Sequence, residues 1–181
     1  DVHAIGADGH VHVLLAHARE QRRRGRHRLV VASLDGDDQR VAAALLAVAG
    51  GEGADTLTGD LGGDRIYGGG GRDTLIEIGN VDFHLTNNSL TGLGTDVLSS
   101  VEVAILTGGG SANDFSVANW TGEAILDAGG GSDSYDVQFT TSGSGTVEVD
   151  DAAGSSDSVV VRGTRYADSL SVRVGQVTKG A

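Results

Sequence analysis

A nine-residue repeat constrains the fold of this chain more strongly than any other feature of its sequence. Residues 50–76 divide without remainder into three nonapeptides, GGEGADTLT, GDLGGDRIY and GGGGRDTLI. Each begins with Gly, carries Asp at position six and has an aliphatic residue at position eight. The following nine residues, EIGNVDFHL, keep Asp82 at position six, with His84 at position eight. A short, fixed period predicts a structure in which each repeat stacks on its neighbours.

Each position of the repeat has a physical role. Glycine allows backbone angles with positive φ and lets carbonyl oxygens approach an ion closely. A short strand follows each turn and directs the aliphatic side chain inward. Two nonapeptides make one flattened coil, so we expect residue n to stack on residue n+18, which pairs Asp55 with Asp73 and Asp64 with Asp82. Stacked carboxylates repel each other unless a cation lies between them, and carboxylate and carbonyl oxygens suit Ca²⁺.

These residues resemble the repeats-in-toxin (RTX), or haemolysin-type, calcium-binding repeat, whose pattern is G-G-x-G-x-D-x-U-x. The resemblance implies a parallel β-roll that holds Ca²⁺ between successive turns, in a protein that bacteria export and that folds on meeting extracellular Ca²⁺. The ligands that it implies are the side chains of Asp55, Asp64, Asp73 and Asp82 and the carbonyls of Gly51, Gly53, Gly62, Gly69 and Gly71. The second repeat departs from the pattern, because Asp60 replaces its second Gly. The alternative is that these Gly and Asp residues form only solvated turns without an ion.

Composition and charge exclude several classes of function. The net charge of −12 argues against a nucleic-acid partner, because phosphates are bound by Lys and Arg. The absence of Cys excludes disulfides, thiolate metal sites and a thiol nucleophile. No apolar run approaches the roughly eighteen residues of a membrane span. Residues 1–49 carry seven Arg and six acidic residues, so residues 50–181 hold a net charge of −13, which favours cations as partners.

The repeat pattern continues after residue 85 with wider spacing. Four segments keep Asp or Asn at position six and an apolar residue at position eight: GGGSANDFS (108–116), AGGGSDSYD (128–136), AAGSSDSVV (152–160) and GTRYADSLS (163–171). Their position-six residues are 20, 24 and 11 residues apart, and apolar runs that we expect to be strands precede three of them, at 103–106, 124–126 and 147–149. Asp133 is the best calcium ligand among them, because three consecutive glycines precede it. Serines near the other loops are equally compatible with turns that bind no ion.

The first 49 residues lack the repeat. The run VAAALLAVA (41–49) fits a helix by propensity, but it precedes a Gly cluster as the later strands do, so we expect a strand. Residues 11–24 fit a helix that ends before Gly25, or a strand at 10–15 followed by a basic loop. We favour strands at 10–15 and 28–34, with an Arg-rich loop at 19–28.

The sequence therefore predicts an all-β protein, a parallel β-roll or β-solenoid with calcium-binding Gly–Asp turns. We expect an N-terminal segment at 1–49, RTX-type repeats at 50–85 and degenerate β-solenoid coils at 86–181. A chain that lacks Met and begins at Asp1 is expected to be a piece of a longer protein.

The function that this pattern favours is structural. We expect no enzyme activity, since G-x-S-x-G, H-E-x-x-H and phosphate-loop motifs are absent. We expect an extracellular or cell-surface calcium-binding module of a larger bacterial protein, such as an adhesin. The open ends of a solenoid can pair with further strands, so neighbouring modules or copies would stack into a fibre or stalk. The alternative is a calcium-dependent accessory module of an exported enzyme that acts on polysaccharide or protein.

Overall fold

All the regular secondary structure of the described chain is β-strand. The computed structural model describes residues 47–139, 145–151, 153–154 and 156–164. No helix occurs in these residues, so none there could cross a membrane as a helix. The all-β prediction is confirmed for this part of the chain. The strands expected at 10–15 and 28–34, the Arg-rich loop and Asp168, at position six of the segment 163–171, lie outside the described residues.

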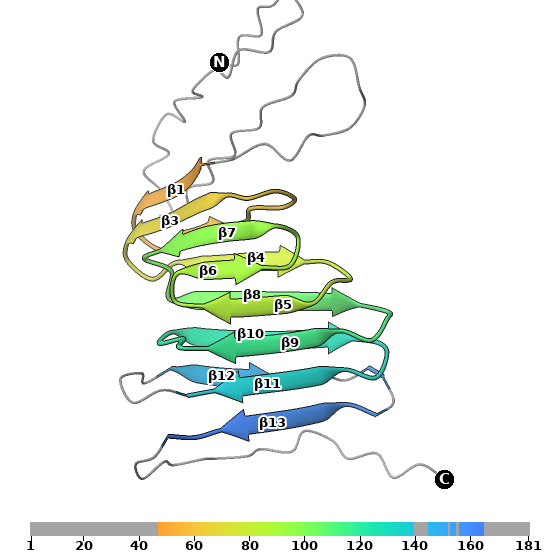
Figure 1. Ribbon diagram of the computed structural model, residues 1–181. Coiled ribbons are helices and arrows are strands. Elements are labelled where there is room, and N and C mark those ends of the chain that lie inside the picture. The colour runs from red at the N-terminus through yellow and green to blue at the C-terminus, as the bar shows by residue number, and fades with distance from the viewer. Residues whose placement is uncertain (1–46, 140–144, 152, 155, 165–181) are drawn as a thin grey trace, which may run out of the picture.

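In the described residues thirteen strands form two sheets, and the chain alternates between them except where three consecutive strands lie in the first sheet (Figure 1). The first sheet has the order β1 (Ala47–Glu52), β3 (Arg65–Gly70), β7 (Thr95–Ser99), β6 (Ser89–Thr91), β5 (Phe83–Thr86), β9 (Asp114–Ala118), β11 (Ser134–Gln138) and β13 (Ser158–Arg162). The second has the order β12 (Thr146–Val149), β10 (Glu123–Gly129), β8 (Val103–Gly109), β4 (Thr74–Ile78) and β2 (Thr56–Leu57). We call one strand of the first sheet and the next strand of the second, with their connections, a coil.

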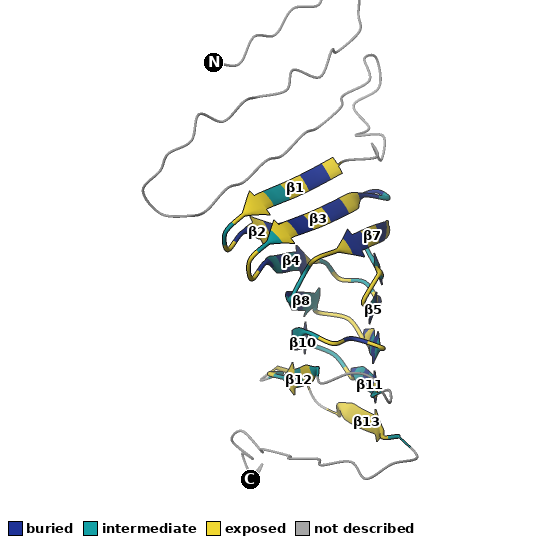
Figure 2. Cartoon of the chain, turned by 90° about the vertical axis from the view of Figure 1, so that its left-hand side faces the viewer, coloured by how far each residue is buried: buried dark blue, intermediate teal, exposed yellow. Residues whose placement is uncertain are grey.

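The 18-residue stacking of the first coils is confirmed. β1 pairs with β3 in parallel, with Ala47 opposite Arg65, and β2 pairs with β4, with Thr56 opposite Thr74. Position eight of each repeat lies between the sheets, where Leu57, Ile66 and Leu75 are at most 2% exposed. Figure 2 shows buried and exposed residues alternating along β1 and β3, as one-sided burial of a strand requires. The part of the run 41–49 that is described is a strand, as expected.

Three antiparallel strands, β5, β6 and β7, interrupt the parallel stack after β4, and we call this group the hairpin. β5 pairs antiparallel with β6, and β6 pairs antiparallel with β7. At the two sides of this group, β7 pairs in parallel with β3 and β5 pairs in parallel with β9. As a result Arg65 lies opposite Val97, 32 residues later. Thr86 closes the turn between β5 and β6, because its Oγ1 accepts the backbone N–H of Ser89 at 3.0 Å. The hairpin therefore adds strands to the first sheet that the nine-residue frame does not predict.

The inward-facing position of the nine-residue repeat is also shifted by one residue at β5. Phe83 is buried at 1% exposure and His84 is exposed, whereas the frame placed residue 84 at the inward position. A one-residue slip exchanges the faces of a strand. Asp82 consequently lies on the exposed side.

The later coils have the wider spacing that the sequence predicts. β9 pairs with β11 with an offset of 20 residues and β11 pairs with β13 with an offset of 24. The strands expected at 103–106, 124–126 and 147–149 are present as β8, β10 and β12. Phe83, Phe115 and Tyr135 stack edge to face through these coils, with ring centroids 5.2 Å and 5.8 Å apart. Val159, at the next step on β13, is 53% exposed.

Candidate metal centre

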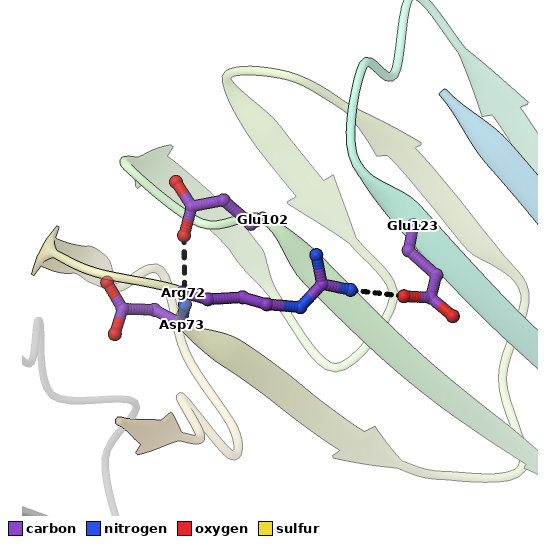
Figure 3. Close-up of polar contacts among 4 residues, drawn as sticks. All are labelled: Arg72, Asp73, Glu102 and Glu123. Carbon is purple, nitrogen blue, oxygen red and sulfur yellow. Dashed lines mark hydrogen bonds and ion pairs between the residues drawn. The ribbon is translucent and has the colours of Figure 1, made fainter. Parts of the chain in front are cut away.

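Buried acidic side chains form a column beside the turns that precede β2 and β4. Asp55 and Asp73 are 1% and 0% exposed, and the backbone N–H of Asp55 donates to Asp73 Oδ1 at 2.9 Å. The predicted stacking of these two residues is confirmed. The column continues to Glu102, whose Oε2 accepts the backbone N–H of Asp73 at 2.9 Å (Figure 3). Glu102 was not predicted, because it lies in a shorter turn without the Gly pattern.

Only one of the two carboxylate oxygens of Asp73 accepts a hydrogen bond from the described residues. Its Oδ2 is buried and has no hydrogen-bond partner among the residues that the structure describes. The adjacent Arg72 pairs instead with Glu123, and Figure 3 shows its side chain extending away from the Asp73 carboxylate. A buried charge without a counter-charge is costly. A cation beside Asp73 Oδ2 would remove that cost.

The glycine loops above and below this column stack backbone against backbone. Gly69 and Gly71 have φ of 107° and 131°, in the left-handed region that favours glycine. A Cβ at Gly69 would lie 2.1 Å from the Gly51 carbonyl oxygen, and one at Gly71 would lie 1.9 Å from that of Gly53. These four glycines are the predicted carbonyl ligands of the first site. Only glycine permits both their conformation and their close approach.

A second column lies beside the turns that precede β3 and β7. The backbone N–H of Asp64 donates to Asp96 Oδ1 at 2.8 Å, and both side chains are buried. Gly62, predicted as a carbonyl ligand, forms an isolated bridge with Gly94 in the same pair of turns. Asp60 holds the place of the second Gly at φ of 59°, so the turn keeps its left-handed conformation without that glycine.

The predicted pairing of Asp64 with Asp82 is wrong. The hairpin lengthens the offset between β3 and its parallel partner in the first sheet from 18 to 32 residues. Asp96 therefore occupies the place that the 18-residue period gave to Asp82. Asp82 is exposed, and its Oδ1 accepts the backbone N–H of Asp114 at 2.8 Å in a later pair of strands.

A signal for Asp96 is present in the sequence. The segment TGLGTDVLS (91–99) carries Gly92, Gly94, Asp96 and Leu98 at positions two, four, six and eight of the repeat. It lacks only the first Gly and stands outside the frame of the earlier repeats. A search for G-x-G-x-D-x-U in any frame would have found it.

The buried, stacked Asp residues and left-handed glycines lie in one short stretch of the chain. Residues 48–76 match the family model of the RTX calcium-binding nonapeptide repeat, a model that describes 4 copies. RTX nonapeptide repeats bind Ca²⁺, and the role of the repeat is structural rather than catalytic. The match runs from β1 to β4 and includes Asp55, Asp64 and Asp73. A search of curated proteins and of solved structures finds no match to the chain.

Glu77 adds a third buried acid next to the second column of the RTX repeats. Its Oε1 accepts the backbone N–H of Gly59 at 2.5 Å, and the side chain is 2% exposed. Burial, aided by repulsion from Asp96, raises the pKa of Glu77 from 4.5 to about 7. Burial likewise raises the pKa of Asp96 from 3.8 to about 6. Without a cation, this part of the protein favours protonated carboxyl groups.

Acid should therefore promote folding of the calcium-free protein. Glu77 binds its proton more tightly in the folded state, so its contribution to stability is complete below pH 4.5 and is lost as the pH rises through about 7. The shift corresponds to about 3 kcal/mol, at about 1.36 kcal/mol for each pH unit. We expect circular dichroism in calcium-free buffer to show more strand at pH 5.5 than at pH 8. Glu77→Gln should raise the folded fraction at pH 8 and flatten this dependence; an unchanged pH profile in the variant would contradict the assignment.

The degenerate coils repeat the same hydrogen-bond ladder. Asp133 is 1% exposed, and its Oδ1 accepts the backbone N–H of Asn113 at 2.8 Å. The backbone N–H of Asp133 donates in turn to Asp157 Oδ1 at 2.9 Å. The position-six residues of the wider coils thus stack as they do in the RTX repeats.

Proposed function

We propose that this chain is a calcium-binding structural module of a larger secreted or cell-surface bacterial protein, built as a parallel β-roll with Ca²⁺ in its Gly–Asp turns. The observation that carries the proposal is the stacking of buried position-six Asp residues between glycine loops, with Asp55, Asp64 and Asp73 in the matched repeats and Asp96 after them. The first site would use the Asp55 and Asp73 carboxylates with the carbonyls of Gly51, Gly53, Gly69 and Gly71. The second would use Asp64 and Asp96 with the carbonyl of Gly62, and Asp82 has no part in it.

Calcium binding would be coupled to folding. Residues 50–181 carry a net charge of −13, and several of the acids lie in the interior of the fold. Without a cation the compact state concentrates negative charge, which destabilises it. Ca²⁺ would neutralise the stacked carboxylates and bridge consecutive coils, so its binding free energy becomes folding free energy. The exported protein would remain loose inside the cell and fold outside it.

Calorimetric titration of the whole chain with Ca²⁺ and with Mg²⁺ tests this function. We expect Ca²⁺ to bind with a dissociation constant of about 10⁻⁴–10⁻³ M, as in other extracellular calcium modules. Mg²⁺ should bind far more weakly, because it demands near-ideal octahedral geometry and keeps its waters. Binding of neither ion, or equal binding of both, would contradict a calcium module.

We also propose that copies or neighbouring modules associate end to end. β13 ends the first sheet of the described fold and exposes Val159, Val160 and Val161 at 53%, 46% and 38%. A strand edge with apolar side chains is a template for another strand. Sedimentation velocity in the presence of Ca²⁺ should show association that grows with protein concentration. A monomer at millimolar concentration would contradict end-to-end assembly.

A further inference from the structure

Three carboxylates converge at the far end of the described coils, outside the matched repeats. Asp133 precedes β11, Asp157 precedes β13, and Asp151 follows β12 in the opposite sheet. One carboxylate oxygen of each lies within 4.8 Å of the other two. Asp151 has no place in the nine-residue pattern, so the repeat alone does not predict this group. Proximity of acids is common on surfaces, and a site needs further support.

The support comes from the buried side chain of Asp133. Its Oδ1 accepts the N–H of Asn113, whereas its Oδ2 is fully buried and has no hydrogen-bond partner among the described residues. The side chain is 1% exposed, so water does not compensate its charge. Arg162, on the neighbouring β13, pairs with Asp136 instead. The Asp133 carboxylate thus has one buried oxygen without a partner among the described residues, and this carboxylate lies close to those of Asp151 and Asp157.

Tyr135 and Gly154 shape the surroundings of the cluster. The Tyr135 hydroxyl accepts the backbone N–H of Ala128 at 2.7 Å and donates to Asp151 Oδ2 at 2.6 Å, which fixes that carboxylate. Burial raises the pKa of Tyr135, so it remains a neutral donor. Burial also raises the pKa of Asp151, and repulsion from Asp157 and Asp127 adds to this effect.

Gly154 lies where the last two turns meet. It has φ of 99°, and a Cβ there would lie 3.0 Å from the Gly131 carbonyl oxygen and 3.2 Å from Asp157 Oδ1. A backbone carbonyl and a carboxylate therefore approach the same glycine. This combination of oxygens resembles the donor set of the first two columns.

We propose that Asp133, Asp151 and Asp157 bind a Ca²⁺ ion that joins the last described coil to the one before it. Hard carboxylate oxygens from two connections, β10–β11 for Asp133 and β12–β13 for Asp151 and Asp157, match the preference of this cation. The inference rests on the proposed function for the identity of the ion, but it shares no ligand with the two earlier sites. The ion has a clear structural task, because every residue of β13 is exposed and apolar burial holds this coil only weakly.

Hydrogen exchange of the whole chain, followed by mass spectrometry during a Ca²⁺ titration, tests the proposal. We expect Ca²⁺ to slow exchange in β12 and β13 by at least about tenfold, and separately in β1 to β4. In Asp151→Asn the protection of β12 and β13 should be lost, while that of β1 to β4 remains. Asp150→Asn, an exposed neighbour with the same change of charge, should behave as the unmodified chain.

A second variant guards against a local folding defect. Asp133→Asn keeps an oxygen for the N–H of Asn113 and should also lose the protection of β12 and β13; an amide is already accommodated at the stacked position of Asn113. The proposal is overturned if Ca²⁺ protects β12 and β13 equally in all these chains, or leaves them unprotected while β1 to β4 respond. Failure of β1 to β4 to respond would instead overturn the proposed function.

Discussion

Asp73→Asn is expected to weaken calcium binding at the first site by at least about tenfold while leaving the strand content of the calcium-free protein unchanged or higher. The amide keeps an oxygen in place for the N–H of Asp55, so the stacking of the coils survives. It removes a buried negative charge, whose isolation destabilises the calcium-free fold. Calorimetric titration gives the affinity, and circular dichroism in calcium-free buffer gives the strand content.

Asp82→Asn is the matched control. It changes the net charge by the same amount, and the sequence frame gave Asp82 the same role as a ligand. In the structure Asp82 is exposed, and its Oδ1 accepts the N–H of Asp114, a contact that an amide also makes. We expect its calcium affinity to equal that of the unmodified chain. Equal losses in the two variants would show that total charge, and not the buried column, determines binding.

Gly68→Ala should disrupt the fold and the first site together. A Cβ at this position would lie 1.6 Å from the backbone oxygen of Ser100 and 2.5 Å from Asp73 Oδ2. The backbone oxygen cannot move without separating consecutive coils, and the carboxylate cannot move without leaving the column. Overpacking of this kind costs about 3 kcal/mol or more. Urea unfolding at saturating Ca²⁺ measures the loss.

Gly110→Ala provides the comparison for this glycine. A Cβ there meets no atom within 4 Å, and Gly110 is exposed. The unfolding free energy of the Gly110→Ala variant should stay within about 0.5 kcal/mol of that of the unmodified chain. If both variants unfolded at the same urea concentration, close backbone stacking at Gly68 would not be what stabilises the coils.

The repeat region could be predicted from sequence because its structure is set by a local, strict period. Gly at the turns, Asp at position six and an aliphatic residue at position eight fix the turn conformation, the strand faces and the 18-residue register of Asp55 and Asp73 at once. The wider coils were predicted for the same reason, since an apolar strand before each Gly cluster leaves little freedom in the pairing.

The partner of Asp64 in the second column could not be predicted from the nine-residue period. The hairpin of β5, β6 and β7 depends on antiparallel pairs that a periodic frame does not contain. Because of the hairpin, Asp64 stacks with Asp96 and not with residue 82. A one-residue shift in β5 also places Phe83 in the interior in place of His84. Glu77 was missed because it occupies a buried position of β4, where the pattern predicts no acid.

The far cluster shows a different limit of sequence reasoning. Asp133 was recognised by the glycines before it, but Asp151 approaches it from the opposite sheet, at a position to which the repeat assigns no role. Only the three-dimensional stacking of the coils places these carboxylates together. Asp151 therefore had to be found in the structure.

Far-ultraviolet circular dichroism of the whole chain during a Ca²⁺ titration tests the central claim, that calcium between stacked Asp residues holds the coils together. We predict that the strand signal rises with Ca²⁺ and saturates near millimolar concentration. The Asp55→Ala, Asp73→Ala double variant should lose most of that rise. A spectrum that is the same with and without Ca²⁺, and the same in the double variant, would contradict the claim.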